Sequence, residues 1–113
     1  LRRAPEVVEG LVLADTRMTA DTPEGRANRR AMLAIVDREG PSGVAREMMP
    51  NLLGRTTRET DATLESTVRR LIKQQSPDGI RGAIQRMMTR MDATDVLTGC
   101  EVPALVVVGD EDT

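Results

Sequence analysis

The chain has 113 residues, of which 39% are hydrophobic and 30% are charged, and its net charge is −2 with a pI near 5.2. This length allows one domain at most, and the acidic balance argues against nucleic acid as a partner, because phosphate binding needs a basic excess. No apolar run approaches the roughly 20 residues that span a bilayer, and the first residues do not read as a signal peptide, so no membrane partner is predicted. The single cysteine, Cys100, excludes an internal disulfide and fits a reducing, cytoplasmic compartment.

Two residue classes are missing from the sequence. It contains no histidine, so it cannot complete a Ser-His-Asp or Cys-His relay by itself. It contains no Phe, Tyr or Trp, and seven methionines take over part of their core-filling role. Because the chain opens without Met, on what reads as the end of a helix, we expect a segment of a longer protein.

Two short apolar runs predict strands. The first, GLVLADT at residues 10–16, follows a helix tail and a Pro-containing turn in residues 1–9. The second, ALVVVG at residues 104–109, follows a connector at residues 95–103. Short β-branched runs bounded by Gly and polar residues are typical of strands buried on both faces of a parallel sheet.

Helical stretches are predicted between the two strands. The first begins at Thr22 as N-cap and ends at Gly40-Pro41. The second begins at Ser42 as N-cap and is kinked or broken at Pro50. Ser76 is predicted to be the N-cap of a later helix, because a hydroxyl residue again stands directly before a proline, as at Thr22. The last two helices are predicted over residues 60–75 and 76–92.

The predicted fold class is α/β, with two parallel core strands flanking a multi-helix cap. The strands are joined right-handedly by a helical excursion of about 85 residues, far longer than a usual crossover. The extra helices would form an inserted layer over the C-terminal edge of the sheet, where ligands of open α/β sheets bind.

Three acids, Asp110, Glu111 and Asp112, follow the second strand directly. A carboxylate held at this edge can orient a histidine during acyl transfer or bind Mg²⁺. A solvated turn is the simpler interpretation. Asp15 ends the first strand on the same edge, where a turn residue is again the simpler interpretation.

The stretch VPALVVVGDEDT resembles the strand and acid-bearing turn of the α/β-hydrolase family, in which Pro, an apolar strand, Gly, two residues and Asp place the acid of the catalytic triad. The resemblance implies that Gly109 is the turn glycine and Asp112 is the triad acid, with Asp15 as runner-up because some relatives carry the acid after the preceding strand. Residues 22–54 resemble the cap of esterase-like and enol-lactonase-like members. The implied regions are a core segment at 1–16, a helical cap or lid at 17–98 and a core segment at 99–113.

The sequence departs from the family pattern in its other catalytic groups. No Gly-x-Ser-x-Gly nucleophile elbow is present. The GPSG stretch around Ser42 has neither the glycine spacing of that motif nor the strand that precedes it. The family order Ser, acid, His implies a serine upstream and a histidine downstream of this segment. We therefore expect the isolated segment to be inactive and poorly stable.

A flexible thioether wall in the cap would suit an apolar acyl group, and we predict that Met48, Met49, Met87 and Met88 bind substrate. Core filling is the simpler interpretation for most of the seven methionines. Cys100, with no histidine to activate it, is predicted to be a buried inert thiol. The arginines of the helices are predicted to lie on solvated faces.

The predicted function is therefore a segment of a serine α/β-hydrolase that cleaves a carboxylic ester or a lactone. The predicted partner is that small-molecule substrate. No cofactor, metal, nucleic acid or membrane is expected to take part, and the oligomeric state is left open. Two alternatives stay open. One is a Mg²⁺-dependent phosphoryl-transfer or receiver-like domain that uses the acidic tip, meaning Asp110, Glu111 and Asp112. The other is a non-catalytic helical interaction module.

Overall fold

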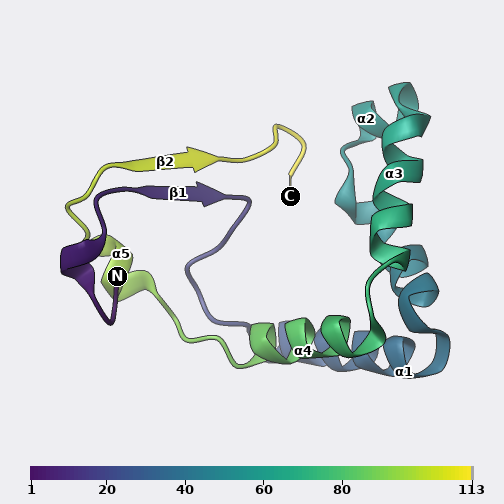
Figure 1. Ribbon diagram of the computed structural model, residues 1–113, viewed down its shortest axis with the longest axis horizontal. Coiled ribbons are helices and arrows are strands. Elements are labelled where there is room, and N and C mark those ends of the chain that lie inside the picture. Colours follow the sequence, from purple (N-terminus) through teal and green to yellow (C-terminus); the bar gives the residue numbers. More distant parts are fainter. Residues whose placement is uncertain (113) are drawn as a thin grey trace. The chain divides into compact units, whose positions relative to one another are not determined.

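A computed structural model describes residues 1–112, and Figure 1 shows the chain as a parallel strand pair and a set of packed helices. The chain divides into two compact units: a sheet unit, Leu1–Ala20 with Met91–Thr113, and a helical unit, Asp21–Arg90. The elements in chain order are η1 (Pro5–Val7), β1 (Leu11–Ala14), α1 (Pro23–Leu52), α2 (Arg55–Thr60), α3 (Ala62–Lys73), α4 (Pro77–Met88), α5 (Thr94–Thr98) and β2 (Ala104–Val107).

The sheet unit is built on β1 and β2, which pair in parallel as the sequence predicts. The register runs from Leu11 opposite Ala104 to Ala14 opposite Val107. One further hydrogen bond extends the ladder, from the Asp15 amide to the Val107 carbonyl at 2.9 Å. The two strands therefore end together, and the residues that follow them share the C-terminal edge of the pair.

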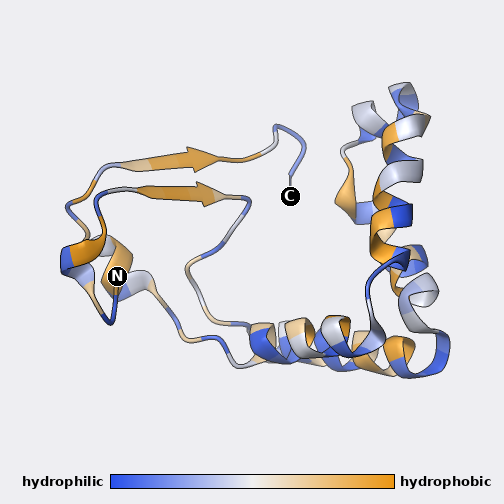
Figure 2. Ribbon diagram, in the orientation of Figure 1, coloured by the Kyte–Doolittle hydropathy of each residue, from blue (hydrophilic) through white to orange (hydrophobic). Residues whose placement is uncertain are grey.

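The prediction that both strands are buried on both faces is wrong for the described residues. β2 is exposed at all four positions, with Leu105 58% and Val106 67% exposed. β1 alternates between half-buried and exposed residues. Figure 2 shows both strands as hydrophobic along their length. Hydrophobic runs without alternation are the sequence pattern of strands that are covered on both faces.

The helical unit begins and is capped where the sequence predicts. The Thr22 hydroxyl accepts a hydrogen bond from the Gly25 amide at 3.0 Å, and the Ser76 hydroxyl accepts one from the Gly79 amide at 3.0 Å. Each cap satisfies an amide that has no partner inside its helix. Asp61 caps α3 in the same way.

A small hydrophobic core holds the helical unit together. Val36 and Val44 on α1 and Ile84 on α4 are its buried centre. Both α3 and α4 pack against α1. Half-buried residues surround this centre: Met32, Leu33, Ile72, Ile80, Met87 and Met88.

The chain changes direction inside α1 at Gly40. Its φ of 62° and ψ of −158° are not helical, and glycine is essentially the only residue that adopts them. The predicted end of the helix at Gly40-Pro41 is therefore a kink, since the helix resumes at once. Ser42 lies inside the resumed helix and is not an N-cap, and Pro50 does not break the helix, which ends two residues later at Leu52.

Gly40→Ala is expected to lower the free energy of unfolding by about 1–3 kcal/mol, because a Cβ makes this backbone conformation strained. Gly82, in the middle of α4, is the matched control: its backbone is ordinary and a Cβ there meets no atom within 4 Å. Gly82→Ala should raise stability by about 0.5–1 kcal/mol. Denaturant unfolding measures both variants, and equal effects at the two glycines would contradict the assignment of strain to Gly40.

An ion-pair cluster lies beside the kink. The guanidinium groups of Arg46 and Arg38 contact the Glu39 carboxylate at 2.5 and 2.6 Å. They hold the pKa of Glu39 at about 2, below its ordinary value of 4.5. A carboxyl group whose pKa is lower in the folded state stabilises the fold above its unfolded pKa and loses that contribution as the pH falls through the folded pKa.

Glu39→Gln is therefore expected to lower stability at pH 6 and to have only a small effect at pH 2. The difference should shrink between pH 4.5 and pH 2, the window set by the ordinary and folded pKa values of Glu39. Urea unfolding of both proteins across this range measures it. A difference that is constant with pH would mean that the ion pairs do not carry the effect.

Two short helices lie where the sequence analysis did not predict them. α2 follows α1 directly, and α5 occupies part of the predicted connector at residues 95–103. Both are about one turn long, too short for an apolar period to be recognised. Residues 1–4, predicted as the end of a helix, are not helical.

Candidate active site

Asp15 and Asp112 come together at the C-terminal edge of the strand pair. Asp15 follows β1 directly, and its amide is bound to the last residue of β2. Asp112 lies in the turn after β2, and its amide donates to the Gly109 carbonyl at 3.1 Å. The sequence predicted these two acids as alternatives for one role, and the structure places both at this edge of the strand pair.

The neighbouring Asp112 carboxyl group raises the pKa of Asp15. The hydrogen bond to Asp112 is the largest cause, followed by the charge of that neighbour and by desolvation. A carboxyl group that donates a hydrogen bond must hold its proton, and a second negative charge nearby favours the protonated form.

The backbone at Asp15 is unusual. Its φ is 43°, and within residues 1–112 it is the only non-glycine residue with a positive φ. Asp tolerates this left-handed conformation better than most residues, yet it remains uncommon. The chain thus leaves β1 in a constrained conformation at the first residue past the strand.

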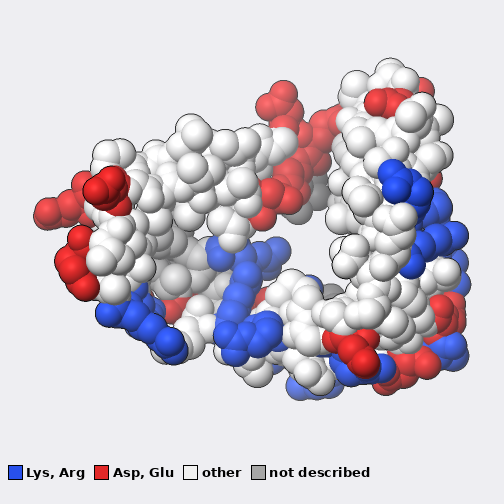
Figure 3. Space-filling model, viewed as in Figure 1, with Lys and Arg blue, Asp and Glu red and all other residues white. Residues whose placement is uncertain are grey.

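Acidic side chains gather beyond the ends of the two strands (Figure 3). Asp110 and Glu111 share the turn with Asp112 and are exposed. Across residues 1–112, no group of three or more acidic, cysteine or histidine side chains has an arrangement that could hold a metal ion. The acidic tip therefore offers no metal centre in support of the Mg²⁺-dependent alternative.

The four methionines predicted to bind substrate all belong to the helical unit. Met49 is only 4% exposed, and Met87 and Met88 pack around the hydrophobic core. Met48 is 36% exposed. Core filling accounts for the first three in this structure, and substrate contact by the four residues stays a prediction.

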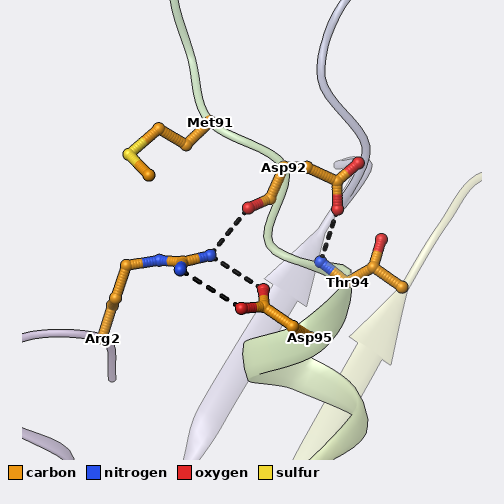
Figure 4. Close-up of a pocket in the computed structure, with 5 residues that line it drawn as sticks. All are labelled: Arg2, Met91, Asp92, Thr94 and Asp95. Atoms are coloured by element: carbon orange, nitrogen blue, oxygen red, sulfur yellow. Dashed lines mark hydrogen bonds and ion pairs between the residues drawn. The ribbon is translucent and has the colours of Figure 1, made fainter.

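An open depression in the sheet unit is occupied by its own ion pairs (Figure 4). Arg2 donates to both carboxylate oxygens of Asp95 at 2.8 and 3.2 Å and to the Asp92 carbonyl at 2.8 Å. Asp92 in turn accepts from the amides of Thr94 and Ala20. These bonds tie the first residues to the start of α5, so the cluster has a structural role and presents no unsatisfied charge to a ligand.

Cys100 lines a second, apolar cavity of about 260 Å³ in the sheet unit. The thiol is half-buried, whereas the sequence predicted a buried one. No histidine exists to activate it. The other lining residues are Leu11, Leu13, Met18, Leu97, Thr98, Val102 and Ala104.

The sequence analysis missed a buried carboxylate at the start of the helical unit. The Asp21 side chain is 2% exposed and lies 2.8 Å from Nε of Arg29 and 3.6 Å from Nη2 of Arg90. Arg26 donates to the Asp21 carbonyl at 2.6 Å. The prediction that these helix arginines are only solvated is therefore wrong for Arg26 and Arg29. Their placement five and eight residues after Asp21, on one side of the first helical turns, was the available signal.

The two parallel strands are separated in the chain by a long helical insertion, and a carboxylate lies just beyond their C-terminal ends. This arrangement is that of an α/β-hydrolase-like segment. A family model described as the Ndr family matches residues 2–113. The chain belongs to the Ndr family, which has the α/β-hydrolase fold.

A solved structure supports this class independently. It is a thermophilic esterase from Thermogutta terrifontis, studied with malate bound, and is 36% identical to the chain with a TM-score of 0.85. The match covers 93% of this chain and 39% of the esterase chain, so the chain spans about two fifths of that relative's length. No curated protein matches the chain. Within residues 1–112, no helix is both long and apolar enough to cross a membrane.

Proposed function

We propose that this chain is the cap and acid-bearing segment of a serine hydrolase that cleaves a carboxylic ester. The observation that carries the proposal is the position of Asp112, one turn beyond the C-terminal end of β2, in a chain 36% identical to an esterase. Acids at this edge of a parallel sheet are held on a rigid scaffold and face the crevice where ligands bind.

In this function Asp112 orients a histidine and stabilises the imidazolium that forms when the histidine takes a proton from the nucleophilic serine. The serine and the histidine would come from outside this segment, because the chain has no histidine and no nucleophile elbow. In this mechanism the triad acid transfers no proton itself.

The substrate is proposed to be an ester with an apolar acyl group, and a lactone is the closely related option. The support is the methionine-rich character of the helical unit, since thioether side chains adapt to apolar groups of different shape. Met48 is the most exposed of the four methionines proposed to contact substrate. The phosphoryl-transfer alternative has no support from the comparisons.

Hydrolysis of p-nitrophenyl acetate and butyrate by the full-length protein tests the proposal. We expect turnover that is blocked by a serine-directed phosphonate and that depends on Asp112, as detailed in the Discussion. Absence of turnover with these esters and with a simple lactone would reject the hydrolase function and favour a non-catalytic member of the fold.

A further inference from the structure

The first and the last residue of the helical unit lie next to each other in space. The unit begins at Asp21, two residues before α1, and ends at Arg90, two residues after α4. One oxygen of the Asp21 carboxylate lies 3.6 Å from Nη2 of Arg90. Helices α1, α2, α3 and α4 all lie between the two residues in the chain. This ion pair therefore joins the point at which the chain enters the unit to the point at which it leaves.

The Asp21 carboxylate holds a partner on each side. Its second oxygen lies 2.8 Å from Nε of Arg29, on α1. The Asp21 side chain is 2% exposed and that of Arg90 is 29% exposed. A carboxylate so far withdrawn from water is costly unless cations accompany it. Because one of its cations belongs to the start of the unit and the other to its end, the burial of Asp21 requires both ends to be in place.

We propose that Asp21 is a clasp that holds the two ends of the helical unit together, through Arg29 at the start and Arg90 at the end, so that residues 21–90 form one closed body. A helix end without such a tie opens locally at little cost in free energy. The clasp is a conformational device of the helical unit, and it does not depend on the proposed ester hydrolysis.

The backbone near Arg90 is what the clasp would restrain. The Thr89 amide donates to the Gln85 carbonyl at 3.2 Å, and the Arg90 amide donates to the Met87 carbonyl at 3.4 Å. These bonds close the last turn after α4, which lies at the edge of the unit. Holding the Arg90 side chain on Asp21 opposes the opening of this turn.

The stretches that adjoin the two ends are also tied together, inside the sheet unit. The Ala93 amide donates to the Met18 carbonyl at 2.8 Å, and the Ala20 amide donates to the Asp92 carboxylate at 3.3 Å. The incoming and the outgoing chain are thus joined by backbone-anchored contacts just before the helical unit begins. This is an independent observation that the two passages are held as a pair.

Hydrogen exchange of the full-length protein, followed by mass spectrometry, tests the clasp. Asp21→Asn removes the charge and keeps the shape, and we expect exchange to rise about tenfold both in the first turn of α1 and at the end of α4. Arg90→Met removes only the second partner, so we expect the increase at the end of α4 alone. The double variant should exchange there no faster than the more affected single variant, since both remove the same contact.

Gly40→Ala is the control for a general loss of stability, because it strains α1 away from the clasp. We expect it to leave exchange at both ends of the unit within about twofold of the wild type. Equal increases in Gly40→Ala and Asp21→Asn would overturn the proposal. Wild-type exchange at the end of α4 in Arg90→Met would overturn it as well.

A change in Asp21→Asn that is confined to the first turn of α1 would show that Asp21 acts only on its own helix, and this too would overturn the proposal. If Asp21→Asn does not fold, as judged by circular dichroism, the comparison of Arg90→Met with Gly40→Ala decides the question. Ester hydrolysis enters none of these measurements, so failure of the proposed function and failure of the clasp are distinguished.

Discussion

Asp112→Asn in the full-length protein is expected to lower kcat for ester hydrolysis by about 10³–10⁴-fold while the fold stays intact. The amide has nearly the shape of the carboxylate but no negative charge, so it neither holds the histidine in the required tautomer nor stabilises its charged form. Since Asp112 is exposed in the turn after β2, the substitution buries no new group. Steady-state kinetics with p-nitrophenyl esters and a thermal melt measure both parts of the expectation.

Asp110→Asn is the matched control for this experiment. Asp110 lies in the same turn, is also exposed and carries the same charge, so loss of general negative potential would affect both variants equally. We expect the control to keep kcat within about twofold. If Asp110→Asn and Asp112→Asn are equally impaired, the turn acts through its net charge and no single triad acid is located there.

Asp21→Ala is expected to lower the free energy of unfolding by about 1–3 kcal/mol, since it removes the carboxylate partner of two half-buried guanidinium groups. Without this carboxylate, Arg29 loses its ion pair and Arg90 loses its nearest anion. In the described part of the chain, Nε and Nη2 of Arg90 are already buried without a hydrogen-bond partner. The substitution therefore leaves two half-buried guanidinium groups without their carboxylate partner.

Denaturant unfolding of Asp21→Ala is compared with Glu65→Ala, which breaks an ion pair of similar length on the surface. Glu65 and Arg69 lie 2.8 Å apart, one turn apart on α3, and both are more than a third exposed. Exposed pairs at this spacing contribute about 0.3–0.5 kcal/mol. Comparable losses in the two variants would show that burial of Asp21 does not govern its contribution.

The fold was largely predictable where local chemistry decides the structure. The caps at Thr22 and Ser76 follow from hydroxyl residues placed before a proline. The parallel pairing follows from two β-branched runs separated by a long helical stretch. Gly40 shows the limit of such reasoning: Gly-Pro signals that a helix is interrupted, but only the packing of the residues around it decides whether the helix ends or kinks.

The candidate site was half predictable from the sequence. Asp112 and Asp15 could both be assigned to the C-terminal edge, because parallel strands end on the same side. The register that aligns the two strand ends and the positive φ of Asp15 could not, because four-residue strands allow several registers and Asp adopts a positive φ only occasionally. For Asp21, the spacing of Arg26 and Arg29 indicates an ion pair, but its burial also depends on Arg90 from a distant helix end, which the sequence does not place.

The parallel pairing of β1 and β2 has a consequence for the order of folding. Arg2 and Asp95, which hold the sheet unit together, are 93 positions apart in the chain, and the whole helical unit lies between them. Closing so long a loop costs chain entropy before any strand bond forms, whereas the helices make contacts nearer in sequence. The helical unit should therefore acquire protection from hydrogen exchange first, and the strands should join last. Asp15 and Asp112 would then meet only at the final step of folding.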